Sequence, residues 1–203
     1  YRQALLIRQA LVARNPASAR WQRDVSVSHE KVGDALKAQG DKPGALLAYR
    51  ASLVIAQALA ARDPASAEWQ QDLTLSHFKI GDVLLAQGQS SESQETYGHG
   101  LVIAETLALR DTANADWQRN LTLGHIRIGD ARVALGDAHG ALIAYRMSLS
   151  VADPLAALDR ANAQWQVDLA EVCFKLSDLA ALGEAEPQHR PGGRGRRARG
   201  RGA

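Results

Sequence analysis

The chain has 203 residues, of which 46% are hydrophobic and only 5% aromatic, so alanine and leucine must fill most of the core. Its single cysteine, Cys173, excludes an internal disulfide and suits a reducing compartment. The formal net charge of +2 is uneven, because six arginines and two glutamates give residues 184–203 a charge of +4 and leave about −2 on the rest.

The chain repeats itself every 48 residues. Tryptophans stand at positions 21, 69, 117 and 165, and the segment WQRDVSVSHEKVGDAL at the first returns as WQQDLTLSHFKIGDVL at the second. Self-similarity at a fixed period indicates a solenoid, in which each unit packs mainly on its neighbours. We therefore predict a repeat array over residues 1–183 and a separate tail over 184–203. In chain order the array holds a partial unit at 1–14, full units at about 15–62, 63–110 and 111–158, and a final helix at 159–183.

Residues 1–14 predict part of a helix. Tyr1 aligns with Tyr49 and Tyr97, so the chain begins in the middle of the second helix of a unit. The segment YRQALLIRQALVA also lacks the polar character of a capping repeat. We therefore expect further repeats or another domain before it.

The unit at 15–62 shows the second helix of a hairpin most clearly. Asp41 is a candidate N-cap and Pro43 suits the first turn, where a missing N–H costs nothing. One face carries Ala45, Tyr49, Leu53, Ala56 and Leu59, and the other carries Leu46, Leu47, Val54 and Ile55. A helix that is apolar nearly all round is expected to be buried on more than one side.

The unit at 63–110 shows the first helix. Ser66 is a candidate N-cap, a role that Ser18, Asn114 and Asn162 share at equivalent positions. From Trp69 to Leu84 apolar residues follow helical spacing, and Gly88 suits the left-handed end. This predicts a helix of roughly twenty residues. The second helix of this unit should start poorly, because Ser93 replaces the alanine of the pattern.

These residues resemble the tetratricopeptide repeat, which places a glycine in the first helix, a glycine at the turn, and alanine and tyrosine four apart in the second helix. The first and third full units match this pattern at Val32, Gly33, Gly40, Ala45, Tyr49 and Pro64, and at Ile128, Gly129, Gly136, Ala141 and Tyr145. The units differ from the family in length, since 48 residues replace the usual 34 or so, as in similar bacterial arrays. The resemblance implies an all-α solenoid of antiparallel helix hairpins with a right-handed superhelix, which binds proteins in the cytoplasm.

We expect no enzyme, cofactor or metal. His29, His77 and His125 recur at one position, but helix axes lie roughly 8–10 Å apart, whereas zinc ligands lie about 2 Å from the ion. Half-buried packing explains these histidines better than metal binding. A nucleophile needs a base held beside it, and the surroundings of Cys173 are explained by the repeat pattern. No phosphate-binding loop is present, and no run approaches the eighteen apolar residues of a membrane helix, so we also expect no membrane contact.

A polar ladder is the main candidate site. The acids Asp34, Asp82, Asp130 and Asp178 each follow a Lys or Arg by three residues. They either form ion pairs along one helix or line a groove for a basic or amphipathic peptide. Nearby apolar residues either pack on the first helix of the next unit or line that groove. The candidate partner-binding residues are Glu30, Asp34, Phe78, Asp82, Ile126, Asp130, Phe174 and Asp178.

Two other functions stay open. The tail at 184–203 should be disordered, and it could bind RNA or another polyanion, although it lacks aromatic residues that stack on bases. The arginines that would do so are Arg190, Arg194, Arg196, Arg197, Arg199 and Arg201. Alternatively, the array is a structural spacer, or it self-associates through uncapped ends and so oligomerises an attached domain.

Overall fold

The computed structural model describes residues 1–185, and residues 186–203 lie outside the described part. The described range holds eight helices and no strand, which confirms an all-α solenoid of antiparallel hairpins. The helices that open each hairpin begin 48 residues apart. The bounds are α1 (Arg2–Arg14), α2 (Ala19–Ala38), α3 (Lys42–Arg62), α4 (Ala67–Ala86), α5 (Ser90–Arg110), α6 (Ala115–Ala134), α7 (Ala138–Leu158) and α8 (Ala163–Ala185).

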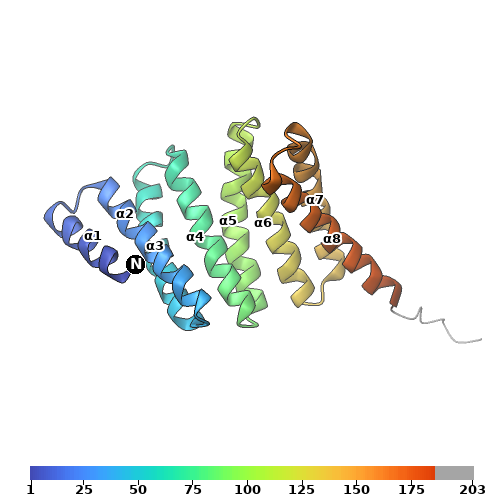
Figure 1. Cartoon of the computed structure of the whole chain (residues 1–203), viewed down its shortest axis with the longest axis horizontal. Coiled ribbons are helices and arrows are strands. Elements are labelled where there is room, and N and C mark those ends of the chain that lie inside the picture. The colour runs from blue at the N-terminus through green and yellow to red at the C-terminus, as the bar shows by residue number, and fades with distance from the viewer. Residues whose placement is uncertain (186–203) are drawn as a thin grey trace, which may run out of the picture.

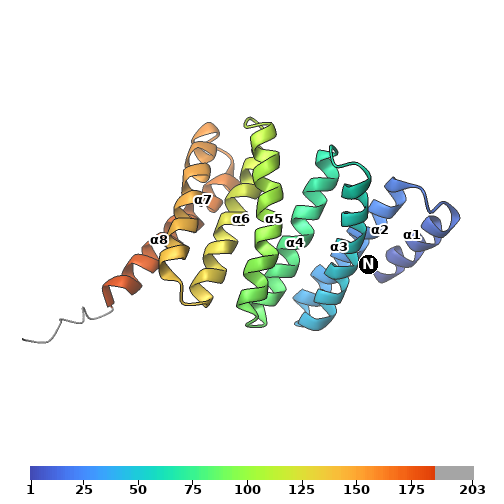
Figure 2. The ribbon, with the colours of Figure 1, turned by 180° about the vertical axis from the view of Figure 1, so that it is seen from behind.

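The helices form two layers along an elongated stack. Each helix packs on its neighbours in the chain. In addition, α4 contacts α6, and α6 contacts α8. The layer of α2, α4, α6 and α8 faces the viewer in Figure 1, and the layer of α3, α5 and α7 faces the viewer from behind in Figure 2. Residues of successive hairpins therefore meet within one layer although they are far apart in sequence.

Local sequence sets where the first helices begin. The side chains of Ser18, Ser66 and Asn114 accept hydrogen bonds from the backbone N–H three residues later, at 3.2–3.4 Å. Asn162 accepts the equivalent bond from Trp165 at 3.2 Å. These contacts satisfy donors that have no partner inside the helix, so the predicted N-caps are confirmed.

Each hairpin turn rests on a glycine in the left-handed backbone region, which residues with a side chain rarely adopt. Gly40, Gly88 and Gly136 have φ angles of 81°, 79° and 78°. After Gly40 the Asp41 N–H reaches back to the Leu36 carbonyl at 2.9 Å, which closes the helix end. The turn then leads directly into the second helix.

The second helix of the middle hairpin differs from the expectation. Asp41 and Asp137 cap α3 and α7 through the N–H of Gly44 and Gly140, whereas α5 has no side-chain cap. Even so, α5 has the same length of 21 residues as α3 and α7, and it begins at the equivalent position of its unit. Ser93, buried, donates to a backbone carbonyl of α4 at 2.9 Å, so tertiary contact replaces the missing cap.

Each full hairpin is centred on a tyrosine packed against a glycine. A Cβ atom on Gly33 would lie 2.5 Å from the ring of Tyr49, and the pairs Gly81–Tyr97 and Gly129–Tyr145 are equally tight. The three tyrosines are buried. The glycine of the repeat pattern therefore serves close helix packing, because any side chain there would displace the ring.

The outer side of the second helices is not buried. Leu47 and Val54 on α3 are 70% and 66% exposed, so the expected burial on more than one side is wrong for this face. The second helices lie at the edge of a two-layer stack and have no third layer outside them. By length and composition alone, α3 and α7 could also cross a membrane, so the expectation that no run is long and apolar enough is wrong. Core helices meet the same criteria, and the inner faces of both helices pack inside the array.

Candidate partner-binding face

Each step of the stack joins one aspartate to two donors. Tyr49 Oη donates to Asp34 Oδ1 at 2.8 Å within one hairpin, and Lys79 Nζ from the next hairpin donates to the same atom at 2.7 Å. We call such a group an aspartate junction. It recurs at the next two steps with Tyr97, Asp82 and Arg127, and with Tyr145, Asp130 and Lys175, over distances of 2.6–2.9 Å.

The junctions correct the interpretation of ion pairs along one helix. Of the four ladder pairs with i,i+3 spacing, only Lys31 and Asp34 form an ion pair, with 3.8 Å between Nζ and Oδ2. Lys79 instead reaches back 45 residues to the preceding hairpin. The tyrosine hydroxyl already holds the carboxylate at the edge of its helix, and the next cation approaches it from the neighbouring helix. The ladder therefore fastens hairpins to one another.

The junctions also change how their members titrate. Burial raises the pKa of the Tyr49 hydroxyl, and so does its hydrogen bond to Asp34. For Asp34 itself, burial would raise the pKa, but hydrogen bonds from Lys79 and Tyr49 outweigh it and hold the pKa below the usual value. The junction consequently contains a neutral hydroxyl, a carboxylate and a cation.

A second set of ion pairs, which was not predicted from the sequence, joins hairpins near the N-terminal ends of the first helices, where the repeated tryptophans stand. Arg23 binds both carboxylate oxygens of Asp72 on the next hairpin, and Arg119 does the same to Asp168. The signal in the sequence was an arginine and an aspartate 49 residues apart. At the middle step the equivalent residues are Gln71 and Asn120, so the ion pair is absent there.

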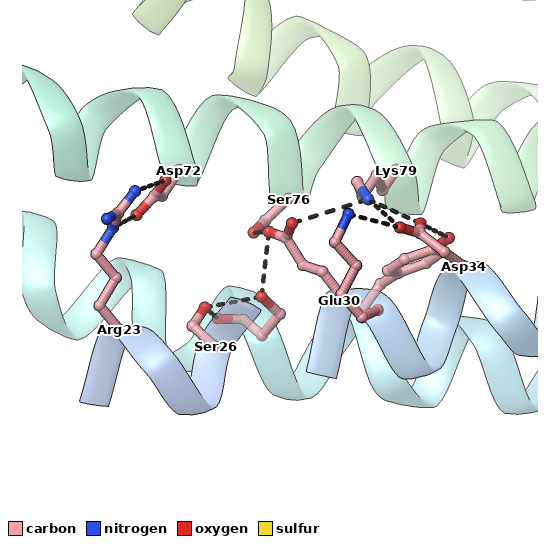
Figure 3. A network of polar contacts seen from close by, with 10 residues as sticks. Arg23, Ser26, Glu30, Asp34, Asp72, Ser76 and Lys79 are labelled. Atoms are coloured by element: carbon pink, nitrogen blue, oxygen red, sulfur yellow. Dashed lines mark hydrogen bonds and ion pairs between the residues drawn. The ribbon is translucent and has the colours of Figure 1, made fainter. Parts of the chain in front are cut away.

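A buried polar network lies beside the first junction (Figure 3). Glu30 accepts hydrogen bonds from Ser52 and Ser76 at 3.4 and 3.3 Å, and Lys79 Nζ lies 3.8 Å from its other oxygen. Ser26 Oγ adds a contact of 2.8 Å to Ser52 Oγ. Burial raises the pKa of the Glu30 carboxyl, and the charge of Lys79 partly opposes this shift.

The next step fills the same place with hydrocarbon. Phe78 stands 48 residues after Glu30, and Gly100 and Gly124 replace the two serines that bind the carboxylate. Cβ atoms on these glycines would lie 2.8 and 2.9 Å from the Phe78 ring, so the ring occupies the space of the missing side chains. At the third step Ile126 lies in a hydrophobic cluster. Successive hairpins thus meet through different side chains on one backbone geometry.

The structure separates the eight candidate residues into three groups. Phe78 and Ile126 are 2% and 3% exposed, so they form the packing between hairpins and not an open groove, because the next first helix covers them. Phe174 is 70% exposed and Asp178 is exposed, and Asp178 takes part in no ion pair within the described part of the chain. The remaining four are Glu30, Asp34, Asp82 and Asp130, which are half-buried in the network and junctions described above.

We call the surface that carries the aspartate junctions the junction face. Two hollows lie at equivalent places on it. One, of about 360 Å³, lies between Asp82, Arg127 and Asp130, with Leu85 on its wall. The other, of about 170 Å³, lies one step further, between Asp130 and Asp178, with Phe174 on its wall. Asp130 belongs to both. An extended chain lying across the steps would meet an acidic and an apolar group at each one.

The three histidines are packed side chains, as expected, and His29 is half-buried, whereas the other two are buried more deeply than predicted. His77 and His125 are buried, and burial lowers the pKa of His77 to about 4. Within residues 1–185 no cluster of three histidine, cysteine or acidic side chains could hold a metal ion. Cys173 is exposed and forms no disulfide. The arginines of the tail, 190–201, lie outside the described residues.

Comparisons with known proteins support no family assignment. No protein-family model and no curated protein matches the chain. Solved structures that it resembles include MamA RS-1, a double mutant, at 14% identity, 91% coverage of this chain, 88% of that chain and a TM-score of 0.39. A de novo designed helical repeat protein, DHR64, follows at 9%, 90%, 92% and 0.37. BtubC (BKLC) from P. vanneervenii gives 13%, 98%, 95% and 0.38.

Proposed function

We propose that this chain is a protein-interaction scaffold that presents its junction face to an extended segment of a partner protein. The observation that carries the proposal is the pair of equivalent hollows sharing Asp130. A repeating surface suits a ligand that repeats as well, such as an extended peptide with basic and apolar side chains.

The last step offers the strongest attachment for such a segment. At the inner steps a neighbouring cation already neutralises the aspartate, whereas Asp178 is exposed and without an ion pair in the described residues. Phe174, on the same helix one turn earlier, supplies exposed apolar surface. A peptide with a lysine or arginine next to an apolar residue would contact both side chains. The basic residue would pair with Asp178, and the apolar residue would cover the ring of Phe174.

A peptide-display library tests this proposal. Panning on the chain should enrich peptides with a basic residue beside an apolar one. Their affinity should fall roughly tenfold or more with Asp178→Lys or Phe174→Ala, since each removes one of the two contacts. Asp116→Lys, an equal charge change at the opposite end of the first helices, is the control and should leave affinity unchanged. Enriched peptides that bind all three variants equally would refute the proposed face.

The alternatives of the sequence analysis remain predictions. Polyanion binding by residues 190–201 requires affinity that falls steeply with salt and vanishes when the tail is removed. A role as a structural spacer, or association through the ends of the array, requires no peptide at the junction face. Membership of the tetratricopeptide repeat family is likewise part of this proposal. Its support is the tight Gly33–Tyr49 pair and its equivalents.

A further inference from the structure

The layer of second helices exposes large apolar side chains on the side away from the junction face. This layer faces the viewer in Figure 2. Val54 on α3 and Val102 on α5 occupy equivalent positions and are 66% and 62% exposed, and Leu47 and Leu109 on the same helices are exposed as well. An apolar surface that extends over neighbouring helices marks an interaction site.

The outer face of α3 has the spacing of a helix–helix contact. Leu47, Ala51, Val54, Ala58 and Ala61 follow one another at intervals of four, three, four and three residues. This is the spacing of the seam between two helices in a coiled coil. The three alanines leave room for close approach. The occupant that fits this face is therefore another helix.

A second copy of α3 fits this face in the antiparallel direction. In two antiparallel helices related by a two-fold axis over a central residue, the residue seven before the centre faces the one seven after it, and the residue three before faces the one four after. With the axis over Val54, Leu47 faces Ala61 of the second copy, and Ala51 faces Ala58. Leu47 then meets a small side chain, and the facing alanines Ala51 and Ala58 let the two helices approach closely.

The charges on α7 agree with the same axis. Val102 on α5 and Ser150 on α7 stand 48 and 96 residues after Val54, so each is the equivalent centre on its own helix. On α7, Arg146 is four residues before this centre and Asp153 three after it, and both are exposed. The axis places each beside its opposite charge in the second copy. This arrangement favours the pairing of two copies.

The outer helices are long enough for this pairing. Each of α3, α5 and α7 has 21 residues and is therefore about 32 Å long, so a copy of the same helix can lie along its whole length.

We propose that two copies of this chain associate back to back through α3, α5 and α7, with antiparallel helices about a two-fold axis over Val54 and Val102. The junction face lies on the opposite layer and stays free in this dimer. The assembly therefore presents two junction faces to partner proteins.

Cross-linking at the axis tests this geometry. In a Cys173→Ser background, Val54→Cys and Val102→Cys place each cysteine opposite its own copy, so oxidation with copper phenanthroline should give disulfide-linked dimers. Leu109→Cys alone should not link, because Glu95 of the second copy faces it, whereas Leu109→Cys combined with Glu95→Cys should. Efficient linking of Leu109→Cys alone, or none at Val54 and Val102, overturns the proposal.

A charge exchange tests the same interface without cysteines. By sedimentation equilibrium, Arg146→Asp should weaken the dimer roughly tenfold, and Arg146→Asp with Asp153→Arg should restore it, because the pair is re-formed with reversed charges. A wild-type chain that stays monomeric over the whole concentration range overturns the proposal. So does binding to anionic phospholipid vesicles through Val54 in place of dimer formation, which would assign the face to a membrane. Circular dichroism establishes that each variant is folded.

Discussion

Lys79 and Asp34 lie 45 residues apart in sequence, and their nitrogen and oxygen atoms lie 2.7 Å apart in the structure. The same carboxylate oxygen accepts the Tyr49 hydroxyl. One aspartate thus ties together the two helices of its own hairpin and the first helix of the next. This contact couples the stability of neighbouring units, which is the property on which a solenoid depends.

Removing a junction aspartate should destabilise the array. Asp82→Ala leaves the Tyr97 hydroxyl and the Arg127 guanidinium without their shared acceptor, so we expect a loss of about 1–3 kcal/mol in the free energy of unfolding. Asp178→Ala removes the equivalent but exposed side chain and should change stability by less than about 0.5 kcal/mol. Urea unfolding followed by circular dichroism measures both. Equal losses would show that the junctions do not stabilise the stack.

Two glycines of the middle hairpin should respond in opposite directions to alanine. Gly81→Ala drives a methyl group into the Tyr97 ring and should cost about 1–3 kcal/mol. Gly98→Ala adds a methyl where no atom lies within 4 Å, in the interior of α5, so it should stabilise by up to about 1 kcal/mol. Thermal unfolding distinguishes the two. A stabilising Gly81→Ala would contradict the close packing described here.

The two phenylalanines give a matched comparison of position within the stack. Phe78→Ala empties the space between the second and third hairpins and should cost about 3–5 kcal/mol. Phe174→Ala, at the equivalent but exposed position, should cost less than about 0.5 kcal/mol. Denaturant unfolding of the pair measures the difference. Similar costs would mean that a further covering of Phe174 exists in solution.

Acidification should destabilise the protein through His77. Burial lowers the pKa of this imidazole to about 4 in the folded state, below the ordinary value of 6.5, so the unfolded state binds the proton more tightly. The stability from neutral His77 is therefore complete above about pH 6.5 and is lost as the pH falls towards 4. His77→Gln should flatten this part of the stability curve. His139→Gln, an exposed change on α7, is the control and should leave the slope in place.

Much of the fold was predictable because its signals are local. The N-caps Ser66 and Asn114 and the left-handed Gly88 act within a few residues of their own positions, so their roles follow from the sequence. The 48-residue period then dictates that every hairpin adopts the same geometry. The candidate site was less predictable. Phe78, Ile126 and Phe174 share one position in the repeat, and nothing in their own segments distinguishes buried from exposed.

The sequence by itself determined the number and order of the helices and most of their ends, because hydrogen bonds inside a helix and at its caps depend on neighbours in the chain. The start of α5 is the exception, since it depends on the bond from Ser93 to α4. Only the tertiary structure decided which charges pair and which apolar faces stay open. Lys79 has Asp82 three residues away, yet it binds Asp34, because the packing of one hairpin on the next brings that carboxylate closer. The outer face of α3 is open for the same reason, since it lies on the side of the stack where no further layer packs.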